Sequence, residues 1–131
     1  MSQSGETADT LAAVKEARAK GAKVISICNV VGSSLARESD GVLYTHAGPE
    51  IGVASTKAYT AQIAMLCLFA LKLAGVKGVL GKDAIRKILG DLKSIPSRFQ
   101  NILKSKERVA AVAKENSHYG CFLFLGRNIN F

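Results

Sequence analysis

The sequence predicts an α/β fold with a parallel β-sheet, on three observations. Helix-like and strand-like segments alternate over residues 1–76. The strand-like segment KVISIC is apolar almost throughout, and loops rich in glycine and hydroxyl side chains lie before the helix-like segments. Short, nearly continuous apolar runs are typical of strands buried on both faces of a parallel sheet, and helices connect such strands.

The chain begins with the polar stretch SQSGET, and helical spacing follows it. Apolar residues recur at that spacing in LAAVKEA, which predicts a helix over residues 7–20. Ser4 is expected as its N-cap, Glu6 in its first turn, and Gly21 as the glycine that ends it. The polar stretch is either a disordered tail or the loop that follows a β-strand.

Two strands are predicted next, KVISIC over residues 23–28 and GVLYTH over residues 41–46. Between them, the glycine and serines of VGSS indicate a turn, and residues 34–38 are expected to form one short helical turn. The loop AGPEIG then leads into the second long helix-like segment.

That segment is a long apolar helix, which begins near residue 53 or 55, reaches residue 74 and ends at Gly75. Its stretch AQIAMLCLFALKLAGV contains Lys72 and is shorter than the ~20 residues that a membrane span needs. A helix buried on most sides, in a core or a subunit interface, is therefore favoured over a transmembrane helix.

The C-terminal third changes character. KDAIRKILGDLKSI and PSRFQNILKSKERVAAVAKENS each carry an apolar stripe, which predicts two amphipathic helices, expected as an antiparallel pair. Pro96 begins the second of them, a position that proline favours. CFLFLGRN, residues 121–128, is expected to form a strand that stops at Gly126.

Composition limits the classes of function. The net charge of +8 is distributed along the chain without a block of five basic residues, which favours a solvated basic surface over a nucleic-acid interface. Cys28, Cys67 and Cys121 lie far apart, which argues against a disulfide framework or a zinc site and predicts buried free thiols. His46 and His118 are isolated, so no metal site is expected. No signal peptide is evident.

Two loops could carry chemistry. In SQSGET, the hydroxyls of Ser2, Ser4 and Thr7 stand before a helix whose first backbone N–H groups lack partners, an arrangement that suits a phosphate. Glu6 and Asp9 must then point away from the ligand, toward solvent or a capping contact. The alternative is an ordinary capped helix after a polar tail.

The second loop, GPEIGVASTKAYT, places Ser55 and Thr56 at the start of the long helix. Free N–H groups and hydroxyls would again face a ligand there, although a capping arrangement for a core helix is the favoured interpretation of this loop alone. Ligands bind α/β sheets at the carboxyl edge, and two loops that converge there make a stronger prediction than either one.

SQSGETADTLAAVKEARAKGAKVISICNVVGSSLARESD and AGPEIGVASTKAYTAQIAMLCLFALKL together resemble the isomerase region of the glucosamine-6-phosphate synthase family. The resemblance implies a Rossmann-like three-layer SIS domain (sugar isomerase domain). It assigns residues 1–80 to a first SIS domain without its leading strand and helix, 81–119 to a helical linker, and 120–131 to the start of a second SIS domain. It also implies a sugar-phosphate site with Ser2, Gln3, Ser4 and Thr7 around the phosphate and Val53 and Ser55 beside the sugar.

The same resemblance implies the activity of a longer enzyme. Members transfer the amide nitrogen of glutamine to fructose 6-phosphate and isomerise the product to glucosamine 6-phosphate, as cytoplasmic homodimers without a metal or organic cofactor. The family's glutaminase domain is not seen in these residues, and its acid–base residues belong to the second SIS domain beyond Phe131. The chain is thus expected to be an internal fragment that holds no catalytic residue, binds neither nucleic acid nor membrane, and is inactive alone. The alternative is a non-catalytic phosphosugar-binding module.

Overall fold

The computed structural model describes residues 1–51 and 55–123. The chain divides into two compact units, Met1–Arg86 and Lys87 onward. Each unit is described by itself.

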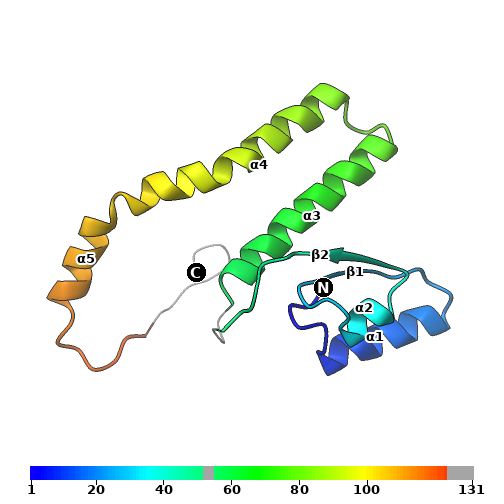
Figure 1. The fold of residues 1–131 in the computed structure, drawn as a ribbon, viewed down its shortest axis with the longest axis horizontal. Helices are drawn as coiled ribbons and strands as arrows, with labels where there is room; N and C mark the ends of the chain where they lie inside the picture. Colours follow the sequence, from blue (N-terminus) through cyan, green and yellow to red (C-terminus); the bar gives the residue numbers. More distant parts are fainter. Residues whose placement is uncertain (52–54, 124–131) are drawn as a thin grey trace. The chain divides into compact units, whose positions relative to one another are not determined.

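The first unit alternates helices and strands, as the sequence predicts (Figure 1). Helix α1 spans Ala8–Ala19, strand β1 Ile25–Cys28, the single-turn helix α2 Ser34–Arg37, strand β2 Gly41–Tyr44 and helix α3 Lys57–Val76. β1 and β2 pair in parallel, with Ile25 opposite Gly41 and Cys28 opposite Tyr44. The α/β prediction with a parallel sheet is therefore confirmed.

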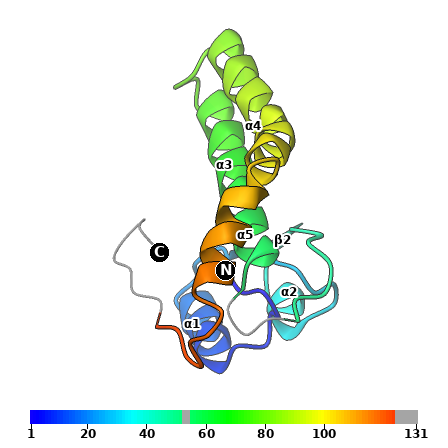
Figure 2. The ribbon, with the colours of Figure 1, turned by 90° about the vertical axis from the view of Figure 1, so that its left-hand side faces the viewer.

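The core lies on the face of the sheet that α1 and α2 cover (Figures 1 and 2). Strand side chains alternate between faces, so Ser26 and Cys28 share this face with their partners in β2. Cys28 and Leu35 are completely enclosed here, packed with Val14 of α1. Helix α3 contacts β1 as well.

Helix α1 begins later than the sequence suggests. Its N-cap is Thr7, so the prediction of Ser4 at this position is wrong. Gly5 adopts a left-handed φ of 71°, which turns the chain away from a helical path. The Ser4 hydroxyl instead accepts a hydrogen bond from the Glu6 backbone N–H at 3.2 Å, outside the helix.

Helix α3 is longer and more exposed than expected. It has 20 residues, so the argument that it is too short to span a membrane fails. Among the described helices, α3 alone has the length and composition of a membrane span, a test that core helices of soluble proteins also pass. It runs past Gly75, and the left-handed glycine after it is Gly78, with φ of 69°.

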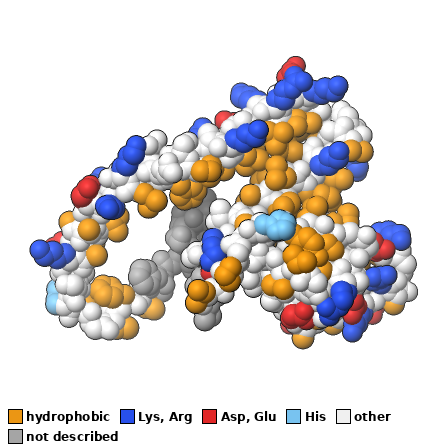
Figure 3. Space-filling view, in the orientation of Figure 1, with side chains coloured by type: hydrophobic (Ala, Val, Ile, Leu, Met, Phe, Trp, Pro, Cys, Tyr) orange, Lys and Arg blue, Asp and Glu red, His pale blue; other side chains and the backbone are white. Residues whose placement is uncertain are grey.

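Burial of α3 on most sides is not found within the described residues, where only Ala58 and Leu71 of this helix are buried. Hydrophobic side chains gather over this part of the molecule (Figure 3). Burial of the cysteines is likewise confirmed for Cys28 alone, because Cys67 of α3 and Cys121 are exposed.

The predicted helix boundary at Pro96 is wrong. A continuous helix, α4, spans Lys82–Leu103 with Pro96 inside it, and α5 follows over Lys106–Glu115. Proline removes one backbone donor from a helix. The hydroxyls of Ser94 and Ser97 donate to the carbonyls of Asp91 and Ser94 at 2.7 and 2.8 Å and add side-chain bonds to these turns.

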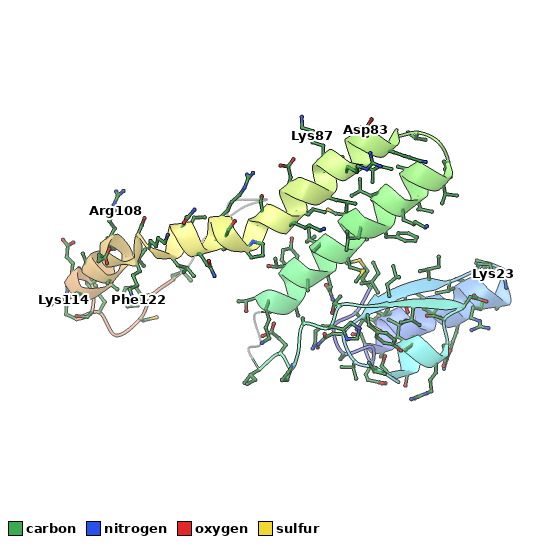
Figure 4. All side chains as sticks on the ribbon, turned by 45° about the horizontal axis from the view of Figure 1, so that its top comes forward. Lys23, Asp83, Lys87, Arg108, Lys114 and Phe122 are labelled. Carbon is green, nitrogen blue, oxygen red and sulfur yellow. The ribbon has the colours of Figure 1, made fainter. Side chains whose placement is uncertain are left out.

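The basic residues of the second unit come from separate elements. Lys87 projects from α4, and Arg108 and Lys114 project from α5 (Figure 4). Residues 121–123 form neither helix nor strand, and the rest of the predicted strand 121–128 lies outside the described residues.

Candidate functional site

The SQSGET segment is a folded loop at the carboxyl end of β1. The Ser2 N–H donates to the Ile27 carbonyl at 3.1 Å, and the Gln3 carbonyl accepts from the Asn29 N–H at 3.1 Å. Ser2 thus forms a parallel bridge with Cys28. These bonds favour the loop interpretation of the segment and are inconsistent with a disordered tail.

The loop is held in a tight curl by its own hydroxyls. Ser2 is buried, with 8% of its surface exposed. Its hydroxyl accepts a hydrogen bond from the Gly5 N–H at 3.0 Å and lies 3.1 Å from the Thr7 hydroxyl. A Cβ atom on Gly5 would lie 2.1 Å from Ser33 Oγ. Only glycine therefore fits this position, both for its backbone angle and for its contact with Ser33.

The N-terminus of α1 offers free donors to an anion. Within residues 1–51 and 55–123, the N–H groups of Ala8, Asp9 and Thr10 have no hydrogen-bond acceptor. The Thr7 side chain does not cap the helix. Unpaired N–H groups and the helix dipole together attract negative charge to this end of a helix.

The acidic residues of the loop do not occupy these donors. The Glu6 carboxylate accepts from the Ser34 N–H at 2.8 Å and so caps α2 rather than α1. This hydrogen bond is the main reason why the pKa of Glu6 lies below its usual value of 4.5. Asp9 is exposed to solvent. The expectation that Glu6 turns toward a capping contact is confirmed.

The first loop meets the loop after β2 around one cavity. This cavity has a volume of about 370 Å³, and its lining residues are Gln3, Asn29, Val30, His46, Gly48 and Pro49. Gln3 of the first loop and Gly48 and Pro49 of the loop after β2 thus lie together at the carboxyl edge of the sheet, whereas none of the described residues 55–60 lines this cavity. Of the predicted site residues, only Gln3 is among these lining residues. Ser2, Ser4, Thr7 and Ser55 are not, and Val53 lies outside the described residues.

At the start of α3, a carboxylate that the sequence reasoning overlooked occupies the donors. Glu50 accepts from the N–H groups of Thr56 and Ala58 at 3.3 and 3.2 Å. The Ser55 hydroxyl donates to the same carboxylate at 3.5 Å. These bonds favour the capping interpretation of this loop over N–H groups that are free to face a ligand. The bond from Ala58 is the main cause that lowers the pKa of Glu50.

A third carboxylate, that of Asp40, accepts hydrogen bonds from the two residues that precede β1. Asp40 accepts from the Val24 N–H at 2.9 Å and from the Lys23 ammonium at 3.2 Å. The hydrogen bond from Val24 is again the largest of the causes that hold the pKa of Asp40 below 3.8.

Acid is expected to destabilise the first unit through these three carboxylates. A carboxyl group whose pKa is lower in the folded state stabilises the fold at any pH above its unfolded pKa, and this contribution is lost as pH falls through the folded pKa. The usual values are 4.5 for Glu6 and Glu50 and 3.8 for Asp40, so the loss begins below these values. Thermal melts between neutral pH and pH ~3 measure it.

Glu6→Gln is the variant that isolates one contribution, because its amide oxygen can still accept from Ser34 without titrating. Its melting temperature is expected to fall less steeply with acid than that of the unmodified chain. An identical pH profile for the two proteins would contradict the role given to Glu6.

Comparison with known proteins gives a consistent result. The family model described as "SIS domain" matches residues 1–72. The chain is 50% identical over 131 residues to the glutamine–fructose-6-phosphate aminotransferase [isomerizing] of Leifsonia xyli, and 50% identical to that of Caldanaerobacter subterraneus. All of this chain is aligned in both cases, and it spans 21% and 22% of those two proteins.

A solved structure shares the fold. The C-terminal domain of glucosamine-fructose-6-phosphate aminotransferase from Francisella tularensis superposes with a TM-score of 0.81 at 41% identity. The alignment covers 88% of this chain and 33% of that one. The matching family model covers more than half of the chain and includes the Ser2–Thr7 loop. The chain belongs to the SIS domain family.

Proposed function

We propose that the first unit binds a phosphorylated sugar. The phosphate would lie among Ser2, Gln3, Ser4 and Thr7, at the N-terminus of α1. The observation that carries this proposal is that the N–H groups of Ala8–Thr10, beside these hydroxyls, have no acceptor among the residues that the structure describes. Val53 and Ser55 would lie beside the sugar, which requires Ser55 to exchange its bond to Glu50 for one to the ligand.

The identity to the two aminotransferases suggests which sugar phosphate is bound. The chain would serve a synthase that converts fructose 6-phosphate and glutamine to glucosamine 6-phosphate and glutamate in the cytoplasm, without a cofactor. Residues 1–80 would be its first SIS domain, 81–119 a helical linker and 120–131 the start of a second SIS domain. The chain contributes ligand contacts, so residues 1–131 alone would not catalyse the reaction.

Ser4→Ala and Thr7→Ala are expected to weaken binding of fructose 6-phosphate. A hydrogen bond to a charged group contributes about 1.5–3 kcal/mol, so each variant should lose roughly ten- to a hundredfold in affinity. Titration calorimetry measures this loss. Thr60→Ala is the matched control, because the Thr60 hydroxyl donates to the carbonyl of Thr56, the N-cap of α3, and lies outside the Ser2–Thr7 loop (the phosphate loop). Unchanged affinity in both loop variants would refute the assignment of the phosphate.

We also propose that α3 is covered by a second copy of the chain in a homodimer. Tyr59, Ile63, Leu66, Leu68, Leu73 and Val76 of this helix are each at least 37% exposed. An apolar surface of this kind favours association. The exposed Lys72 lies inside the helix, where a protein partner accommodates a charge better than lipid does.

The purified chain is therefore expected to associate, despite its charge of +8. Size-exclusion chromatography with light scattering measures its mass, and binding of the dye ANS reports apolar surface that remains exposed. A monodisperse monomer that binds no ANS would contradict the homodimer and favour a self-sufficient binding module. Flotation with phospholipid vesicles would indicate that α3 meets lipid instead.

A further inference from the structure

Asn29 connects the phosphate loop with the loop over residues 45–51 that follows β2, which is the second loop at the carboxyl edge of the sheet. It is the first residue after β1. Its side-chain oxygen accepts from the Thr45 hydroxyl at 3.0 Å and from the Ala47 N–H at 2.8 Å. Its side-chain nitrogen donates to the Gly48 carbonyl at 2.7 Å, and its backbone N–H donates to the Gln3 carbonyl at 3.1 Å. One residue thus bonds to both loops.

The loop after β2 depends on these bonds for its path. Residues 45–51 lie in neither helix nor strand. His46 has a φ of 50°, which is uncommon for a residue other than glycine, and Gly48 has a φ of 73°. A backbone in this conformation persists where its surroundings hold it. The Asn29 amide supplies that support, because it satisfies the Ala47 donor and the Gly48 acceptor on either side of one peptide bond.

The chemistry of the side chain matters as much as its position. An amide offers both an acceptor and a donor, and Asn29 uses both of them on the same loop. Aspartate would keep the acceptor but lose the donor to Gly48. Alanine would lose all three side-chain bonds while keeping the backbone bond to Gln3.

The cavity between the loops takes its shape from this connection. Gln3 of the phosphate loop and His46, Gly48 and Pro49 of the second loop line it together with Asn29. Movement of the second loop would therefore displace one wall of the cavity. The other wall, at Gln3, would stay fixed by two backbone bonds, from Ser2 to Ile27 of β1 and from Asn29 to Gln3.

We infer that Asn29 is a positioning residue that holds the loop at Thr45–Gly48 against the phosphate loop, so that a sugar phosphate meets both loops at once. This inference rests on the proposed function. Asn29 acts through the second loop and not on the phosphate. Its loss should weaken a ligand that uses both loops and spare a ligand that uses the phosphate loop alone.

The test compares Asn29→Ala with the unmodified chain against two probes, fructose 6-phosphate and inorganic phosphate. Fructose 6-phosphate is expected to bind about tenfold more weakly, since one net hydrogen bond lost between the displaced loop and the sugar has about this effect on affinity. Affinity for inorganic phosphate should stay within about twofold. The Ala47 amide should exchange its hydrogen faster, whereas the Val14 amide in the core should not.

Two further variants support the comparison, one as a control for the loss of an asparagine side chain and one as a milder change in the same contact. Asn116→Ala is the matched control, because Asn116 also donates its side-chain amide to a backbone carbonyl, that of Val112 at 2.8 Å, but outside the first unit. It should leave both affinities unchanged. Thr45→Val removes one bond to Asn29 and gives a milder change in the same direction if Asn29→Ala fails to fold.

Equal weakening of both probes, or unchanged affinity for both, would overturn the inference. An unchanged exchange rate at Ala47 would overturn it as well. If the unmodified chain binds neither probe, the proposed function fails, and the exchange of Ala47 alone then decides whether Asn29 holds the loop.

Discussion

Gly5→Ala is expected to destabilise the first unit by about 3 kcal/mol. Left-handed backbone costs about 1–2 kcal/mol in a residue with a side chain, and steric overlap costs about 1–3 kcal/mol more. Gly5 is buried and has φ of 71°. An added Cβ would lie 2.1 Å from Ser33 Oγ and 2.5 Å from Ser33 Cβ. Ser33 cannot move freely, because its hydroxyl accepts from the Ala36 N–H and caps α2.

Gly32→Ala separates the two contributions. Gly32 has a similar φ of 73°, but an added Cβ would meet no atom within 4 Å. It is expected to lose only the backbone term, about 1–2 kcal/mol. Chemical denaturation of both variants measures the difference. Equal losses at Gly5 and Gly32 would mean that the contact with Ser33 does not matter.

Leu35→Ala is expected to cost a similar amount, about 2–5 kcal/mol, as the loss of a large buried side chain does in other cores. Leu35 is 1% exposed and packs with Val14 and Cys28, so it joins α2 to α1 and β1. Few other large side chains in this small core could move to fill the cavity.

Val31→Ala is the control for this substitution, because Val31 lies just before α2, on the connection from β1, and is 67% exposed. Its free energy of unfolding should change by less than about 0.5 kcal/mol. Similar values for the Leu35 and Val31 variants would show that the core described here does not hold the unit together.

The sheet and its helices could be predicted from the sequence because their signals are local. The apolar run of β1 and the helical spacing of α1 each lie within one element. The prediction that a new helix begins at Pro96 was wrong, because proline usually marks a helix boundary but here lies inside α4. The exposure of α3 was not predictable either, since an apolar helix has the same pattern whether or not a partner covers it.

The candidate site was predictable in part for the same reason. The glycine and hydroxyl residues of the Ser2–Thr7 segment indicate a loop. Its tight curl follows from hydrogen bonds between residues at most five positions apart. Glu50 binds Ala58 eight residues later, and Asn29 binds Gly48 nineteen residues later. No short spacing motif contains either bond, so only the folded chain reveals these two residues.

The amide signals of Ala8, Asp9 and Thr10 in an NMR titration with fructose 6-phosphate test the phosphate site most directly, because these three N–H groups have no acceptor in the described part of the chain. They should shift in a saturable way, inorganic phosphate should compete for them, and fructose without its phosphate should leave them in place. Binding of fructose 6-phosphate that shifts signals elsewhere and leaves these three unmoved would contradict a phosphate site at the N-terminus of α1.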